Sequence, residues 1–263
     1  MARTLIVITS DHGQTGTHTH VDIDDLMRPL YPRTLVYPKL WRHLFSAQAA
    51  AMVSGNSMAN LYLQGETGWQ ERPDFEAHGQ KPADLVATLL AHPAIAHVIY
   101  RRAPGVYVLA GNAGRAVVDA RKVSADDATS SAGVGFSVEG ENPLGYAALP
   151  DSMTRDEIAV LTAGTGFPDT PWQLVEFFRS PRAGDLVVCA RAGFDLRSRF
   201  EYQPHNGSHG ALERDHMLVP AAVNARWASD RPFCTADLFP TILSALGLPV
   251  PDGLSGRSVE LAR

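Results

Sequence analysis

Residues 4–13, TLIVITSDHG, carry the strongest indication of the fold. The centre of this stretch, residues 5–8, is an unbroken apolar run rich in β-branched side chains, which is typical of a strand buried on both faces of a parallel sheet. Asp11 and His12 follow directly, so a carboxylate and an imidazole lie side by side where the strand ends. Open α/β sheets bind their ligands at this edge. The stretch therefore predicts a metal or ligand site beside a buried first strand.

Two further blocks accompany this stretch at the other end of the chain. The first is NGSHG at residues 206–210, followed by ERDHMLVP at residues 213–220. The second is TADLFPTIL at residues 235–243, with GLSGRS at residues 253–258. Together with SDHG, and in this order, the blocks resemble the alkaline phosphatase superfamily, most of all its type I phosphodiesterase/nucleotide pyrophosphatase branch. The resemblance covers both ends of the chain and not its middle.

The resemblance implies a metal-dependent hydrolase of phosphoric esters that acts on a small-molecule substrate. Enzymes of this kind hold two divalent ions, zinc or manganese, about 4 Å apart. By resemblance, Asp11 and His12 fall on the ion that holds the nucleophile, and His209 falls on the other ion. The residue types agree with this assignment, because carboxylates and imidazoles are suitable ligands for zinc and manganese.

Other histidines and acids lie close to these blocks in the sequence. Residues 14–40 are polar and then rich in proline, which predicts a loop that leaves the site directly after His12. The histidines of this loop either contact substrate or metal, or belong to a solvated segment beside the site. In the second block, Asp215 or His216 could orient the imidazole of a metal ligand rather than bind the metal itself. These additional candidates are His18, His20, His205, Asp215 and His216.

The catalytic nucleophile has no counterpart in this sequence. In the family resembled, a metal-binding Asp, a Thr or Ser nucleophile and an Asp-x-x-x-His pair all precede Asp-His-Gly. The chain therefore resembles the C-terminal half of such an enzyme. The alternative to a hydrolase is a non-catalytic remnant, or a subunit that completes a split enzyme with a partner chain. Such a protein would expose an apolar sheet edge and face where the other half packs.

A third hypothesis is an unrelated hydrolase with one metal ion. It would use Asp11, His12 and either His209 or His78. His78 enters because residues 74–78, DFEAH, have the Asp-x-x-x-His spacing, although this segment comes after Asp-His-Gly rather than before it. In an ordinary polar loop this spacing is a coincidence.

The hydrophobic pattern predicts an α/β fold, with a mostly parallel sheet flanked by helices. Residues 1–40 and 151–263 form the alkaline phosphatase-like core, which is incomplete. Residues 41–150 form a small α+β insertion that covers the core like a cap. The elements with the clearest patterns are a helix at 82–91, strands at 96–101 and 105–110, a helix with a capping box at 154–161 and a buried strand at 185–190.

Composition limits the possible functions and locations of the protein. The chain has 263 residues, with 23 Lys and Arg against 28 Asp and Glu, so its formal net charge of −5 gives no electrostatic basis for a nucleic-acid surface. Cys189 and Cys234 stand apart in apolar surroundings, which predicts buried thiols. No apolar run approaches the roughly 20 residues of a membrane span. We expect a cytoplasmic protein without a membrane segment.

Overall fold

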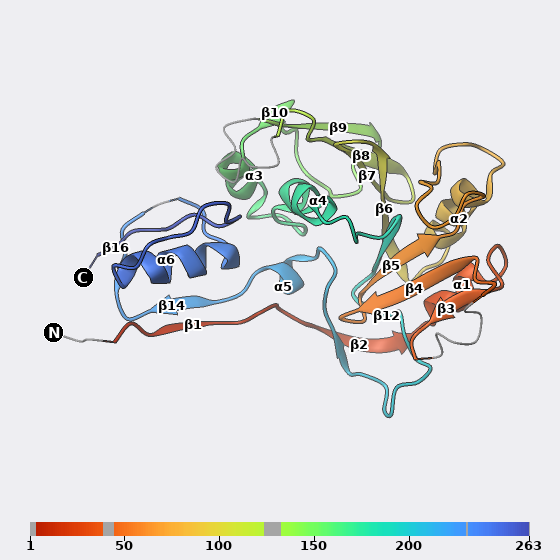
Figure 1. The fold of residues 1–263 in the computed structure, drawn as a ribbon, viewed down its shortest axis with the longest axis horizontal. Coiled ribbons are helices and arrows are strands. Elements are labelled where there is room, and N and C mark those ends of the chain that lie inside the picture. The colour runs from red at the N-terminus through yellow and green to blue at the C-terminus, as the bar shows by residue number, and fades with distance from the viewer. Residues whose placement is uncertain (1–3, 39–44, 124–132, 230, 263) are drawn as a thin grey trace.

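The computed structural model describes residues 4–38, 45–123, 133–229 and 231–262. A nine-stranded sheet is its largest element (Figure 1). The strands of this sheet are β3 (Thr34–Val36), β4 (Ala49–Ser54), β5 (Met58–Leu63), β6 (Ile95–Ala103), β7 (Val106–Ala110), β8 (Gly114–Asp119), β9 (Val134–Gly140), β10 (Ser152–Met153) and β11 (Leu186–Ala190).

The strand order across this sheet is β10-β9-β8-β7-β6-β11-β5-β4-β3. Only the pair β3–β4 is parallel, and the other seven pairs are antiparallel. The chain is therefore mixed α/β, as the sequence predicts, but its large sheet is mostly antiparallel rather than mostly parallel. Short loops such as the one between β6 and β7 permit this, because antiparallel neighbours need no crossover helix.

Helices cover the two faces of the sheet. On one face, α1 (Ile23–Met27) and α2 (Lys81–Leu90) bury apolar side chains against the strands, with Leu85, Leu61 and Tyr100 in the same core. On the other face, α3 (Arg155–Thr162) and α4 (Thr170–Arg179) form a second core around Trp172. Successive side chains of a strand point to opposite faces of the sheet, so each strand contributes to both cores. Tyr100 and its neighbour Ile99, for example, belong to different cores.

Several predicted elements are confirmed. The predicted helix at 82–91 is α2, the two strands of the predicted hairpin are β6 and β7, the buried strand is β11, and α3 has the predicted capping box. The predicted loop at residues 14–40 is wrong, because it contains β2 (Thr15–His20), α1 and β3. β2 has the sequence TGTHTH, which lacks the apolar alternation that usually marks a strand.

The prediction for the first strand is also wrong in its burial. β1 (Val7–Thr9) pairs antiparallel with β14 (Ala221–Val223) and lies away from the nine-stranded sheet (Figure 1). The Ile6 and Ile8 side chains are 52% and 64% exposed instead of buried. An apolar run indicates that a segment favours burial. Whether other segments cover it depends on the rest of the fold.

A second, three-stranded sheet joins distant parts of the chain. β2 pairs parallel with β12 (Gly193–Asp195) and antiparallel with β13 (Gly207–Ser208). This pairing brings the segment after β1 next to the segment around His209. The remaining elements are α5 (Arg214–Met217), β15 (Arg226–Trp227), the 3₁₀ turn η2 (Thr235–Asp237), α6 (Leu238–Ala245) and β16 (Leu261–Ala262).

The predicted core and the predicted insertion share the large sheet. β11, from the segment after residue 150, lies hydrogen-bonded between β5 and β6. The predicted boundary near residue 40 lies outside the described residues, and the division into domains stays a prediction. In the part of the chain that the structure describes, no helix combines the length and apolar character needed to cross a bilayer.

The start of α4 contains an acid in an unfavourable place. Asp169 takes a left-handed backbone conformation, with φ of 59°, and its side chain makes no cap hydrogen bond. Its Oδ2 accepts a hydrogen bond of 2.7 Å from the Gln173 amide, while Oδ1 is buried without a partner among the described residues. Burial raises the pKa of Asp169 to about 6.

We therefore expect Asp169→Asn to stabilise the fold above pH 6. Because the folded state raises this pKa, the carboxyl contributes most stability below about pH 4, and that contribution is lost as the pH rises through about 6. Asn tolerates the left-handed conformation and can still accept from Gln173. Urea unfolding should show the variant more stable by up to about 3 kcal/mol at pH 8 and nearly unchanged at pH 4. An equal gain at both pH values would contradict the assignment.

Candidate functional site

The candidate site forms where the segment after β1 crosses the segment around α5. The Gly13 amide donates a 2.9 Å hydrogen bond to the His216 carbonyl. A Cβ at Gly13 would lie 1.8 Å from the Asp215 carbonyl oxygen, so only glycine permits this crossing. This close approach of two backbones, rather than the end of a buried parallel strand, fixes the position of Asp11 and His12.

Asp11 and His12 present two ligand atoms together. The Nδ1 of His12 donates to the Gly13 carbonyl at 2.9 Å, which leaves the lone pair of Nε2 free. Oδ2 of Asp11 lies 3.4 Å from this Nε2. Two ligands on a tetrahedral zinc ion, each about 2.0 Å from the metal, are about 3.3 Å apart. The hydrogen bond from the His12 amide to Asp11 lowers the pKa of this carboxyl, which keeps it ionised.

His209 lies directly against His12. The two imidazole rings are stacked, with centroids 3.5 Å apart and an interplanar angle of 5°. Parallel rings cannot direct their in-plane lone pairs at one ion about 2 Å from each. They can each face a separate ion, because two-metal sites hold their ions about 3.5–4 Å apart. The arrangement therefore agrees better with two ions than with one shared ion.

The turn between β4 and β5 holds His209 in place. The His209 amide donates to the Gly55 carbonyl at 2.7 Å, and the Ser57 amide donates to the His209 carbonyl at 3.0 Å. Gly55 and Asn56 both have left-handed φ angles, of 61° and 66°, in the three-residue connection between the paired residues Ser54 and Met58. A Cβ at Gly55 would lie 2.5 Å from the His209 carbonyl oxygen and 2.6 Å from its Nδ1. Gly-Asn between two strands signals a turn, but no sequence signal links it to His209.

Electrostatics favour neutral imidazoles at this site. Burial lowers the pKa of His209, and the neighbouring His12 lowers it further. Burial also lowers the pKa of His216, with an additional contribution from His209. A neutral imidazole is the form that binds a metal ion. Both shifts favour the neutral forms of His209 and His216.

His216 supports the site without a free ligand atom. Its Nδ1 accepts from the Ala211 amide at 3.2 Å, so its Nε2 carries the proton and donates to Thr15 at 2.8 Å. Both ring nitrogens are thus engaged, and the buried ring links α5 to the start of β2. This position agrees with the predicted role of orienting the site. Its neighbour Asp215 is exposed on α5 and acts on the His216 ring through its charge, which raises the pKa of His216 against the effect of burial.

The other predicted histidines gather elsewhere. His20 donates from Nε2 to the His205 carbonyl at 2.9 Å, and Nε2 of His205 faces Glu201 at 3.4 Å. His18 hydrogen-bonds the hydroxyl of its neighbour Thr19 at 2.9 Å. Among the described residues, the ring stacked on His12 is that of His209 and not one of these three.

A buried carboxylate connects this second group of histidines to the β4–β5 turn. Asp195, which is fully buried, accepts a 3.0 Å hydrogen bond from the Asn56 side chain. The same Asn56 amide also contacts Nδ1 of His205. The hydrogen bond between Asp195 and Asn56 therefore stabilises the turn to which the His209 backbone is bonded. Sequence reasoning missed this role, because neither residue lies within a recognisable motif.

Asp74 and His78 take part in a different segment from the candidate ligands. The Asp74 carboxylate accepts from the Glu76 amide at 2.8 Å, as in a local turn, and the exposed His78 belongs to the same loop before α2. The Asp-x-x-x-His spacing is thus used for loop structure in this fold.

A pocket of about 470 Å³ opens beside Asp11, His12 and His216. Its opposite wall comes from α3, where the Arg155 guanidinium lines the space. Arg155 donates to the Ser255 carbonyl at 2.9 Å and to the Cys234 sulfur at 2.7 Å, which fixes the cation in the wall. The same lining contains the acids Asp156 and Asp169, and the Arg155 guanidinium lies 3.8 Å from the carboxylate of the buried Asp237.

Comparison with known proteins leaves the chain without an assigned family. No protein-family model, no curated protein and no solved structure matches it. Within the described ranges, no group of three or more His, Cys, Asp and Glu side chains is arranged to hold one metal ion. The donor pair of Asp11 and His12 fits a metal ion in atom type and spacing. Two donors do not complete a coordination sphere, so a metal ion bound there would need further ligands.

We expect Gly55→Ala to displace His209 and to weaken zinc binding at least about tenfold, because the new methyl group meets the ring and carbonyl of His209. Gly145→Ala is the matched control, since Gly145 has nearly the same φ, 63°, but a Cβ there would meet no other atom within 4 Å. Both variants should lose about 1–2 kcal/mol through backbone strain. Calorimetric zinc titration should separate them, and equal zinc affinities would show that the turn does not position His209.

Proposed function

We propose that this protein is a metal-dependent hydrolase of phosphoric esters, of the phosphodiesterase/nucleotide pyrophosphatase type. The observation that carries the proposal is the pair of ligand atoms on Asp11 and His12, 3.4 Å apart, with the His209 ring stacked beside them. The resemblance of the three sequence blocks supports the same reaction class.

The residues divide the work in a definite way. Asp11 and His12 would hold one divalent ion, and His209 would hold a second one. Bound zinc or manganese would lower the pKa of an attacking hydroxyl or water and polarise the phosphoryl oxygens. Arg155, in the lining of the same pocket, would attract the anionic ester and help to orient it. His216 keeps the crossing segments together through its two hydrogen bonds.

The substrate class follows from the pocket and the overall charge. A volume of about 470 Å³ suits a small molecule, and the net charge of −5 disfavours a polyanionic nucleic acid. We therefore propose a small phosphate ester as substrate, and the cytoplasm as the site of action.

The proposal predicts metal-dependent turnover of bis-p-nitrophenyl phosphate by the purified chain with zinc or manganese. Asp11→Asn and His209→Gln should each lower the rate at least about a hundredfold and weaken metal binding, because each removes a proposed ligand. His78→Gln is the matched control, since it removes a histidine that lies outside the site. Absence of metal binding by the unaltered chain, or equal loss in the control, would contradict the proposal.

A second candidate function is supported by a different observation. Ile8 of β1 and Ile6, just before this strand, are two residues apart, so they point to the same side of an extended segment, and both are more than half exposed. Phe239 of α6 and Leu246 just after it are also more than half exposed. Figure 1 shows α6 at the same end of the molecule as β1. Exposed apolar side chains that gather in one region are typical of a protein interface. We infer that the chain could instead be a subunit that completes a split enzyme with another chain.

This second candidate predicts that the isolated chain associates through β1. Ile6→Ser combined with Ile8→Ser should reduce self-association and binding of an apolar dye at least severalfold, because two apolar side chains leave the face. Val138→Ser, at an exposed position on β9, is the control. Sedimentation velocity over a range of concentrations makes the measurement. A chain that stays monomeric and binds no dye would contradict the subunit hypothesis.

A further inference from the structure

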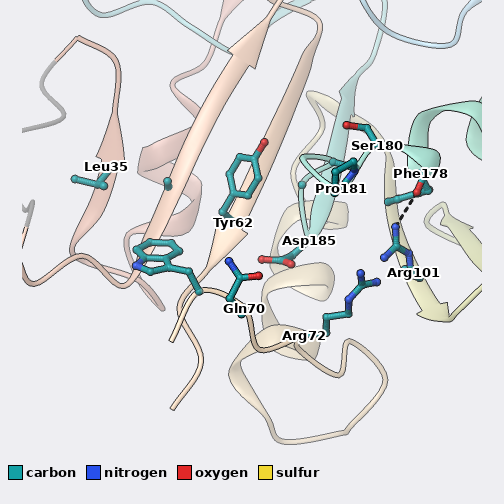
Figure 2. A pocket seen from close by; sticks show the side chains of 13 residues that line it. Leu35, Tyr62, Gln70, Arg72, Arg101, Phe178, Ser180, Pro181 and Asp185 are labelled. Carbon is teal, nitrogen blue, oxygen red and sulfur yellow. Dashed lines mark hydrogen bonds between the residues drawn. The ribbon is translucent and has the colours of Figure 1, made fainter. Parts of the chain in front are cut away.

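A second pocket, of about 450 Å³, lies at the other end of β4 and β5 from the imidazoles (Figure 2). Its floor is a cross-strand row in which Leu35 pairs with Ala50, and Ala50 pairs with Tyr62. Since Ala50 is small and stands between two large side chains, the row is hollow at its centre. Ala50 lies near the start of β4, and Gly55 follows its last residue, so the two positions are separated by about 17 Å.

One wall of this pocket is a loop with a fixed conformation. The Glu71 carboxylate accepts from the Thr67 amide at 2.7 Å and from the Thr67 hydroxyl at 2.8 Å, which closes the loop on itself. The closed loop presents Trp69, Gln70 and Arg72 to the pocket. Trp69 is 41% exposed, although large apolar side chains are usually buried to a greater extent.

The opposite wall, between α4 and β11, is also held by hydrogen bonds. The Tyr62 hydroxyl donates to the Arg182 carbonyl at 2.8 Å, and the Gly184 amide donates to the Asn60 side chain at 3.0 Å. Asp185 accepts from the Leu63 amide at 2.8 Å through one carboxylate oxygen. Figure 2 shows Gln70 and Asp185 pointing toward each other below the Tyr62 ring. The pocket is therefore formed before any ligand arrives.

The charges in the pocket do not balance. Arg101 donates to the Phe178 carbonyl at 3.0 Å and lies over the Phe178 ring at 5.2 Å, so that no acid neutralises it within the described residues. Arg72 makes no hydrogen bond or close ion pair with the part of the chain that is described. Its charge acts on Asp185, where it lowers the pKa against the effect of burial, and Asp185 is the only acid among the described residues of the lining. Two guanidinium groups thus face one carboxylate.

We propose that this pocket binds a small aromatic carboxylate of one ring or two fused rings. The ring would lie on the hollow at Ala50, between the aromatic side chains of Tyr62 and Trp69, because flat aromatic surfaces pack well against one another. The carboxylate would pair with Arg72 and Arg101, since arginine binds planar anions through two parallel hydrogen bonds. The free oxygen of Asp185 would accept a hydrogen bond from a donor group on the ring.

Titration calorimetry with naphthoate as the probe tests this proposal on the full chain. We expect naphthoate to bind, and neutral naphthamide to bind at least about fivefold more weakly, because the amide cannot pair with the guanidinium groups. Arg72→Gln should weaken naphthoate by about fivefold or more and leave naphthamide unchanged. Ala50→Leu should fill the floor and weaken both probes at least about tenfold.

Ala87→Leu is the matched control for the floor variant. Ala87 is exposed on α2, which packs on the opposite face of the sheet, so the same substitution there should leave naphthoate binding unchanged. Failure of the unaltered chain to bind naphthoate at millimolar concentration would overturn the proposal. Equal affinity for naphthoate and naphthamide, or full binding by the Ala50 variant, would also overturn it. None of these outcomes depends on metal binding at Asp11 and His12.

Discussion

Two backbone hydrogen bonds between His209 and the turn from β4 to β5 join the ends of the candidate site to the main sheet. They connect His209 with Gly55 at 2.7 Å and with Ser57 at 3.0 Å. The turn can accept this segment because Gly55 has no side chain, and because the buried Asp195 holds Asn56 in a left-handed conformation. Together with the pairing of β2 with β13, this contact holds the His209 ring against His12.

The same contact sets the chemistry of the imidazoles. Packing against the turn and against His12 buries part of the His209 ring, and burial is the main reason that its pKa is lowered. A protonated pair of stacked rings would repel, whereas a neutral pair offers lone pairs to a cation. A fold that places His209 on His12 is therefore also one that favours the neutral form of His209, and the proposed hydrolase depends on this form.

Elements with strong local signals were predictable from the sequence. The capping box of Thr154 and Glu157 marks α3, and the continuous apolar run of β11 marks a buried strand, since each signal is complete within a few residues. The partners of a strand are not local. β1 has an equally apolar sequence, yet it pairs only with β14 among the described strands and leaves Ile8 exposed. The parallel arrangement predicted for the sheet failed for the same reason, because strand direction depends on how distant segments pair.

The order of residues along the chain already places Asp11 beside His12, with Gly13 after them. Covalent linkage guarantees that adjacency, and it supplies two ligand atoms before the chain folds. Which other histidine joins them depends on folding alone. The fold stacks His209 on His12, uses both nitrogens of His216 in hydrogen bonds, and holds His20 in a separate group. The physical reason is that a ligand needs a free lone pair in the right direction, and direction is set by packing between segments that are far apart in the chain.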